Sequence, residues 1–124
     1  MMDEQYGKVK VDNEVLASIA ATAAKQVPGV HKISTSIMGG IIQWIKRTSD
    51  VGIKIVVGED EVNFELRVII DYGANIPEVT YHIQKMIKEE VERISGLKVG
   101  NVDVVVHGIH FTKKDSVEEG EQND

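Results

Sequence analysis

The chain has 124 residues, of which 42% are hydrophobic and 27% are charged. This length and composition fit one globular domain and exclude a fibrous or wholly disordered chain. The absence of cysteine excludes disulfides, thiolate metal sites and cysteine nucleophiles, and the net charge of −6 argues against a general binder of nucleic-acid backbones. No apolar run approaches the roughly 18 residues of a membrane span, so a direct span is not expected.

The two ends of the chain differ in composition from its middle. Residues 113–124 carry five acids and two lysines with one apolar residue, Val117, which is typical of a solvated tail. We expect three parts: a frayed N-terminus at residues 1–5, one α/β domain at residues 6–111, and a disordered acidic tail at residues 112–124. Because the N-terminus has no apolar signal core, a cytoplasmic protein is expected.

The first third of the chain predicts a strand, a helix and a second strand. Residues 6–11 alternate, with Val9 and Val11 on one face and two lysines on the other, which predicts a half-buried strand. Residues 12–27 have helical periodicity and are followed by a glycine after a proline, which ends a helix. The apolar face of this helix consists of Val15, Leu16, Ile19, Ala20, Ala23 and Val27. Residues 30–33 predict a short strand.

The rest of the chain predicts a hairpin, a helix and a last strand. Residues 51–72 contain two period-2 apolar runs joined by four polar residues, which is typical of a β-hairpin. The clearest helix follows, with Pro77 at its first position and Gly96 where a left-handed terminator belongs. Its apolar stripe consists of Val79, Ile83, Met86, Ile87, Val91 and Ile94. Residues 102–107 alternate again.

The predicted order of elements is β-α-β-β-β-α-β. Crossovers through a helix at both ends, with a hairpin between them, favour an α/β (α+β) fold. We expect a single two-layer sandwich in which two helices cover one face of a mixed sheet. The order of the strands within that sheet is left open by the pattern.

Residues able to do chemistry do not form a catalytic or metal-binding pattern. His107 and His110 have i,i+3 spacing, which places the rings on opposite faces of a continuing strand, and no third ligand is evident. Glu59, Asp60 and Glu61 lack the spaced ligands of a calcium loop and indicate a charged turn. Neither a GxSxG motif nor a P-loop occurs. We therefore expect no enzymatic activity, no catalytic residue, no metal and no cofactor.

Residues 37–47 form an apolar connector between predicted strands, where a polar one would be ordinary. The candidate partner-binding residues in this connector are Ile41, Ile42, Trp44, Lys46 and Arg47. The only tryptophan beside two cations has the composition of a partner anchor or a membrane-interface anchor. The alternative is a short helix or flap that packs its isoleucines into its own domain.

The sheet face away from the helices is a second candidate surface. Val56, Ile69 and Val105 are expected on this face among charged residues, where neighbouring strands would make them an apolar strip for docking or self-association. The alternative is a solvated face with scattered apolar residues, which is common in sheets covered on one side.

Several motifs together resemble the alkaline shock protein family. Residues 71–79 (DYGANIPEV), followed by residues 95–99 (SGLKV) and 102–109 (VDVVVHGI), carry the most specific part. Earlier segments agree with it, namely residues 7–11 (GKVKV), 27–30 (VPGV) and 52–57 (GIKIVV). The resemblance covers about residues 6–111.

The resemblance implies a small cytoplasmic α/β protein of the envelope stress response, with no catalytic site or cofactor to carry over. A non-enzymatic scaffold at the cytoplasmic side of the membrane is the leading hypothesis, with a protein partner, an integral membrane anchor being one form of it. A regulator of fatty-acid or lipid metabolism and a small nucleic-acid-binding regulator are the alternatives. No specific nucleic acid is expected, and a homo-oligomer remains open.

Overall fold

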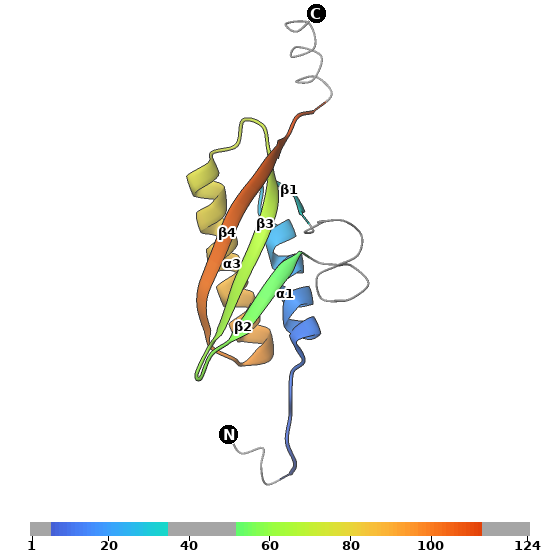
Figure 1. Cartoon of the computed structure of the whole chain (residues 1–124), viewed down its shortest axis with the longest axis vertical. Helices are drawn as coiled ribbons and strands as arrows, with labels where there is room; N and C mark the ends of the chain where they lie inside the picture. The colour runs from blue at the N-terminus through green and yellow to red at the C-terminus, as the bar shows by residue number, and fades with distance from the viewer. Residues whose placement is uncertain (1–5, 35–51, 113–124) are drawn as a thin grey trace, which may run out of the picture.

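A mixed sheet carries two helices on one of its faces in the computed structural model, which describes residues 6–34 and 52–112 (Figure 1). The elements in chain order are α1 (Asn13–Lys25), β1 (Val30–Ile33), β2 (Ile53–Val57), β3 (Val62–Asp71), α3 (Ile76–Ser95) and β4 (Val99–His110). The predicted two-layer α+β fold class is confirmed, including the hairpin and the parallel strand that makes the sheet mixed.

β3 is the central strand of the sheet. β4 runs parallel to it on one side, while β1 and β2 both run antiparallel to it on the other side. Ile33 of β1 pairs with Val68, and Ile53 of β2 pairs with Leu66, so β1 and β2 lie end to end along one edge of β3. Together β1 and β2 therefore occupy the same edge of β3, with residues 34–52 of the chain between them.

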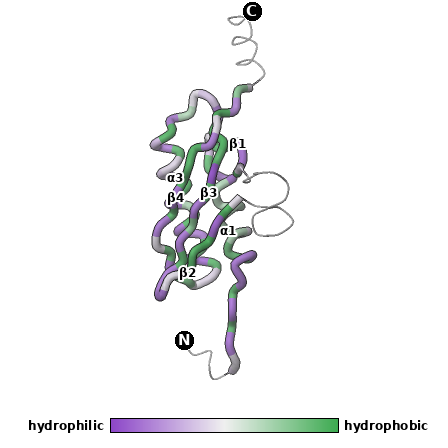
Figure 2. Tube along the Cα trace, in the orientation of Figure 1, coloured by the Kyte–Doolittle hydropathy of each residue, from purple (hydrophilic) through white to green (hydrophobic). Residues whose placement is uncertain are grey.

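The core lies between the sheet and the two helices. Every second residue of β3 from Val62 to Ile70 is buried, because alternate side chains of a strand point to one face. Figure 2 shows the matching alternation of hydrophobic and polar positions along the strands. The helices contribute an alanine-rich face from α1, which allows close approach, and a stripe from α3. The buried residues of that stripe are Val79, Ile83, Ile87 and Val91.

The strand predicted at residues 6–11 is wrong. These residues form an extended segment, here called the N-terminal arm, with 78% of Val9 and 87% of Tyr6 exposed. In Figure 1 the arm leads away from the start of α1 and lies beside no strand. Alternation determines which face a side chain takes, but a strand also needs a neighbouring backbone to bond. Within residues 6–34 and 52–112 the observed order is therefore α-β-β-β-α-β.

Candidate interaction surfaces

The outer face of the sheet, away from the helices, holds the predicted residues Val56, Ile69 and Val105. Val105 pairs with Arg67 across β3 and β4, and Ile69 lies one outward position further along β3, so these two apolar residues are neighbours. Val56 pairs with Asn63 instead. Since Asn63 and Ile69 are six residues apart on one strand, Val56 lies roughly 20 Å from Ile69.

Charged side chains separate the apolar positions of this outer face. Lys54, Glu65 and Asp103 form one row across β2, β3 and β4. This row lies between Val56 and the other two candidates, so the structure brings together Ile69 and Val105 but not Val56. The other candidates, Ile41, Ile42, Trp44, Lys46 and Arg47, lie outside the described residues.

At one end of the outer face, His31 of β1, Asp71 of β3 and His110 of β4 lie together. The rings of His31 and His110 stack with centroids 3.7 Å apart and planes inclined by 6°. Asp71 Oδ1 lies 3.9 Å from His31 Nδ1. Two stacked imidazoles direct their in-plane lone pairs side by side rather than toward a common point, so this arrangement does not present two ligands to one ion. Within residues 6–34 and 52–112, no group of three His, Asp or Glu residues is arranged to hold a metal.

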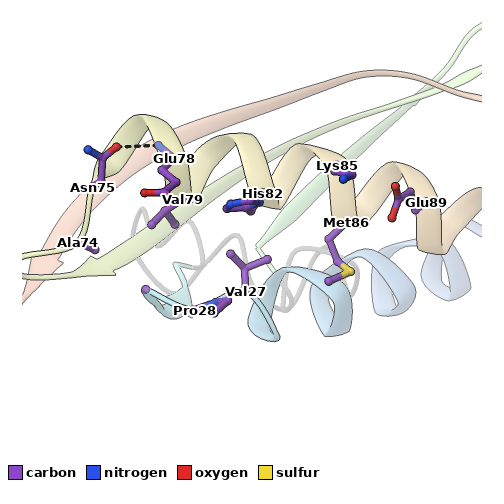
Figure 3. A pocket seen from close by; sticks show the side chains of 11 residues that line it. Val27, Pro28, Ala74, Asn75, Glu78, Val79, His82, Lys85, Met86 and Glu89 are labelled. Carbon is purple, nitrogen blue, oxygen red and sulfur yellow. Dashed lines mark hydrogen bonds between the residues drawn. The ribbon is translucent and has the colours of Figure 1, made fainter.

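A groove lies on the helical layer within the described residues. It has a volume of about 630 Å³ and lies between residues 27–29, which follow α1, and residues 78–89 of α3. Figure 3 shows Val79, His82 and Met86 directed from α3 toward Val27 at the end of α1. The apolar floor comes from Val27, Val79 and Met86 with Ala74 and Pro28 beside them.

Gly29 brings the two sides of the groove together. Its φ is +99°, and a Cβ built there would lie 2.7 Å from Val79 Cγ2 and 3.3 Å from the Cβ of Ala74. Only glycine adopts this backbone conformation without strain and leaves room for Val79 at the same time. The motifs at residues 27–30 and 71–79, which are far apart in sequence, therefore meet at this contact.

Asn75 fixes the start of α3 at the rim of the groove. Its side-chain oxygen accepts a 2.9 Å hydrogen bond from the backbone N–H of Glu78, and Pro77 occupies the first turn (Figure 3). This N-cap satisfies one of the free donors of the first turn. The helix then aligns the polar rim of the groove, which consists of Glu78, His82, Lys85 and Glu89.

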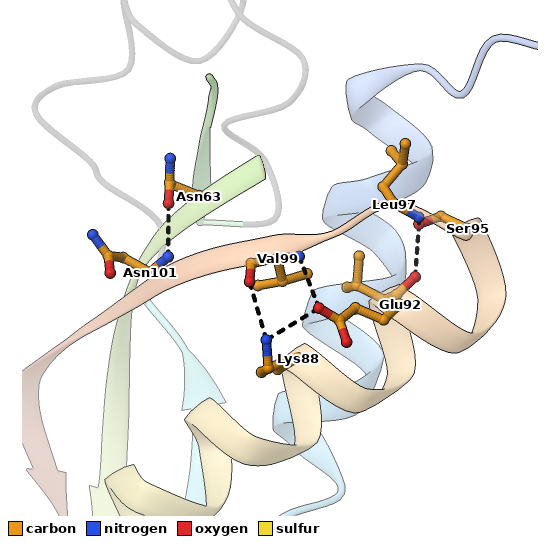
Figure 4. A network of polar contacts seen from close by, with 8 residues as sticks. Asn63, Lys88, Glu92, Ser95, Leu97, Val99 and Asn101 are labelled. Atoms are coloured by element: carbon orange, nitrogen blue, oxygen red, sulfur yellow. Dashed lines mark hydrogen bonds and ion pairs between the residues drawn. The ribbon is translucent and has the colours of Figure 1, made fainter. Parts of the chain in front are cut away.

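A polar network joins the other end of α3 to the start of β4 (Figure 4). The Glu92 carboxylate accepts a 2.9 Å hydrogen bond from the Val99 N–H and one of 3.1 Å from Lys88 Nζ. Lys88 Nζ also donates to the Val99 carbonyl at 3.2 Å. The Val99 N–H, and after it Lys88, holds the pKa of Glu92 below its ordinary value. This network positions β4 against α3.

These observations define a small α+β protein with a groove on its helical layer and an outer sheet face of mixed apolar and charged residues. The model of the alkaline shock protein 23 family, which is described as having a cell envelope-related function, matches residues 1–111. The chain therefore belongs to the alkaline shock protein family, and the resemblance seen in its motifs is confirmed. Neither helix within the described residues is long and apolar enough to cross a bilayer.

Relatives from two genera are similar to this chain over most of its length. The chain is 25% identical over 113 residues to the protein YqhY of Bacillus subtilis (strain 168), covering 90% of this chain and 84% of that protein. It is 26% identical over 102 residues to a stress response regulator gls24 homolog of Streptococcus pyogenes serotype M3, covering 81% of this chain and 57% of that protein. Among solved structures, the manganese form of MamM CTD E289D has a TM-score of 0.48 and 11% identity, covering 78% of this chain and 99% of that one.

Proposed function

We propose that this protein is a non-enzymatic interaction protein that acts in the envelope stress response at the cytoplasmic side of the membrane. The observation that carries the proposal is the groove, because two family-like motifs meet at Gly29 and leave an apolar floor beside them. Membership of a family with a cell envelope-related function supports the envelope as the place of action. Relatives named as stress response regulators support a role in the stress response.

The chemistry of the groove favours a protein segment as its occupant. An apolar floor accepts one or two large apolar side chains, which are the usual anchors of a protein contact. The rim carries both signs of charge, with Glu78 and Glu89 against Lys85. A membrane surface carries one sign of charge, so a mixed rim complements it poorly, whereas a peptide segment can match both. The proposed partner is a cytoplasmic segment of an envelope protein.

The test is co-sedimentation of the purified chain with membranes of its own cells. We expect the wild-type chain to bind, and Pro28→Glu with His82→Glu to weaken binding by about tenfold or more, because both side chains line the groove. Lys54→Glu on the outer sheet face is the matched control and should bind like the wild type. Both variants should keep the free energy of unfolding within about 0.5 kcal/mol of the wild type, as surface changes do.

Treating the membranes with protease distinguishes a protein partner from a lipid one. Binding lost after proteolysis supports the proposal. Binding that survives proteolysis points to a lipid ligand and contradicts it, which would favour the lipid-metabolism alternative. Equal binding of the groove variant and the control would also contradict the use of the groove.

The connector at residues 37–47 is proposed as a second contact with the partner, on the basis of its composition alone. In the same assay, Trp44→Ser with Ile41→Asp should weaken membrane binding while the unfolding midpoint is retained. Unchanged binding of a folded variant would remove the connector from the proposal and leave the groove.

A further inference from the structure

The N-terminal arm has the pattern of a strand but no neighbour to pair with. Its side chains alternate between Lys8 and Lys10 on one face and Val9 on the other, and residues 6–10 are exposed. Val11 packs partly against the core of its own chain, so the free part is residues 6–10. Within residues 6–34 and 52–112, no hydrogen bond joins the backbone of residues 6–10 to another segment.

The sheet has an open edge along β4. Asn101 donates its N–H to Asn63 on the side of β3, whereas the Val102 carbonyl faces the other way and accepts from Gln84 Nε2 at 3.0 Å. Because backbone groups of successive residues alternate in direction, those of Val104 and Val106 also face away from β3. No hydrogen bond to these outward groups is found among the described residues, so they are free to pair with an added strand.

Charge distinguishes β4 from the opposite edge of the sheet. On β4 itself the outer face presents Asp103, and the β3 residues beside β4 on that face are Glu65 and Arg67. The opposite edge, made by β1 and β2, presents Lys32 and Lys54 on that face. A strand with two lysines on one face therefore fits the β4 edge and is repelled by the other.

The faces of the arm and of β4 also agree. If the lysines of the arm lie on the outer face beside Asp103, the alternation turns Val9 toward the helices. There it lies beside Val104 and Val106, which are partly buried against the core. Both the charged and the apolar side of the arm then meet a complementary environment on β4.

The arm of one chain is badly placed for its own β4 edge. Val11 holds the base of the arm against the core next to α1, and α1 packs on α3, β1 and β2. α3 in turn packs on both α1 and β4, so it lies between them in the helical layer (Figure 1). The arm would have to pass around α3 to reach its own edge, whereas in a second copy the edge is open.

We propose that residues 6–10 of one chain add as a fifth strand to the β4 edge of a second copy. The contact is β-augmentation, in which backbone hydrogen bonds to Val104 and Val106 provide the attraction. The charges of Lys8 and Lys10 favour the β4 edge over the opposite edge of the sheet. A contact between an arm and an edge is heterologous, because it joins two different surfaces of the same protein. Each chain carries one arm and one β4 edge, so the copies can form either a closed ring or an open chain. This proposal does not depend on the proposed function.

Sedimentation of the full chain over a concentration series tests the proposal. The wild type should associate. Val9→Pro, placed in an exposed position of the arm, should reduce association by about tenfold or more because it prevents regular pairing, while the unfolding midpoint stays unchanged. Val9→Ile is the matched control and should associate like the wild type. A monomeric wild type at the highest concentration, or Val9→Pro that still associates like the wild type, would overturn the proposal.

A charge exchange tests the choice of edge. Lys8→Glu with Lys10→Glu in one chain, and Asp103→Lys in another, should each weaken self-association by about tenfold. Mixing the two variants should restore association, because the reversed arm of one chain then matches the reversed edge of the other. If mixing restores nothing, or if Lys32→Glu with Lys54→Glu weakens association as much as Asp103→Lys, the β4 edge is not the acceptor.

Discussion

Replacing Gly29 by alanine tests whether the contact between the two motifs holds the groove together. The new Cβ would lie 2.7 Å from Val79 Cγ2, and Val79 is only 6% exposed and cannot move aside freely. Overpacking of this kind costs about 1–3 kcal/mol, and the positive φ of +99° adds about 1–3 kcal/mol for a residue with a Cβ. The two effects together predict a loss of about 3 kcal/mol in the free energy of unfolding.

Gly73→Ala is the matched control, because it separates backbone strain from the close contact. Gly73 has a φ of +94°, but a Cβ there would have nothing within 4 Å. Only the strain then applies, so Gly73→Ala should lose about 1 kcal/mol. In urea, the difference of about 2 kcal/mol between the variants corresponds to a midpoint lower by about 1 M for Gly29→Ala. Equal midpoints for the two variants would refute the reasoning that Gly29 is required by its contact with Val79.

Three further predictions follow from the described contacts. Asn75→Ala removes the N-cap of α3 and should lower the free energy of unfolding by about 1 kcal/mol in urea denaturation, while Asn75→Asp should retain most of it. Ile87→Ala opens a cavity at a fully buried position and should lower the free energy of unfolding by about 2–5 kcal/mol. Ile94→Ala, at a site 53% exposed, should change that free energy little. The pKa of Glu92 in the folded protein is lowered from 4.5. Ionised Glu92 therefore stabilises the fold fully above that pH, and this contribution is lost as the pH falls through the pKa of Glu92 in the folded protein. Glu92→Gln should therefore flatten the acid side of the stability profile, and an unchanged profile would contradict this.

The elements that were predicted correctly are those whose signals are local. The apolar stripe of α3, the left-handed Gly96 with its φ of 79°, and the polar turn between β2 and β3 all depend on residues close in sequence. The details at the ends of the stripes were less predictable. Ile94 and Val15 have helical spacing, yet they are 53% and 49% exposed, because periodicity does not tell where the opposing layer stops.

The features that were missed depend on which strands become neighbours. The stack of His31 on His110 joins residues from β1 and β4 that no spacing connects, and both reach the same end of the sheet only because β3 pairs with both strands. The separation of Val56 from Ile69 has the same origin, since it follows from the register of β2 against β3. The groove needs the end of α1 against α3, and a single glycine in the motif VPGV is the only local signal for it.

The N-terminal arm is the case in which pattern and structure disagree. The alternation of residues 6–11 is a sound strand signal, but pairing is a property of two segments. A strand whose partner belongs to another copy would give this disagreement, which is why the arm and the open edge of β4 are informative together.

The central claim, that this is an interaction protein of the cell envelope, is tested most directly by fractionating its own cells. The protein, at its natural level, would be followed in the membrane and soluble pools before and after a high-salt wash of the membranes. An anchor that relies on apolar contacts resists salt, whereas attraction between surface charges is screened. The account predicts recovery with the membranes that survives the wash. A wholly soluble pool would contradict it.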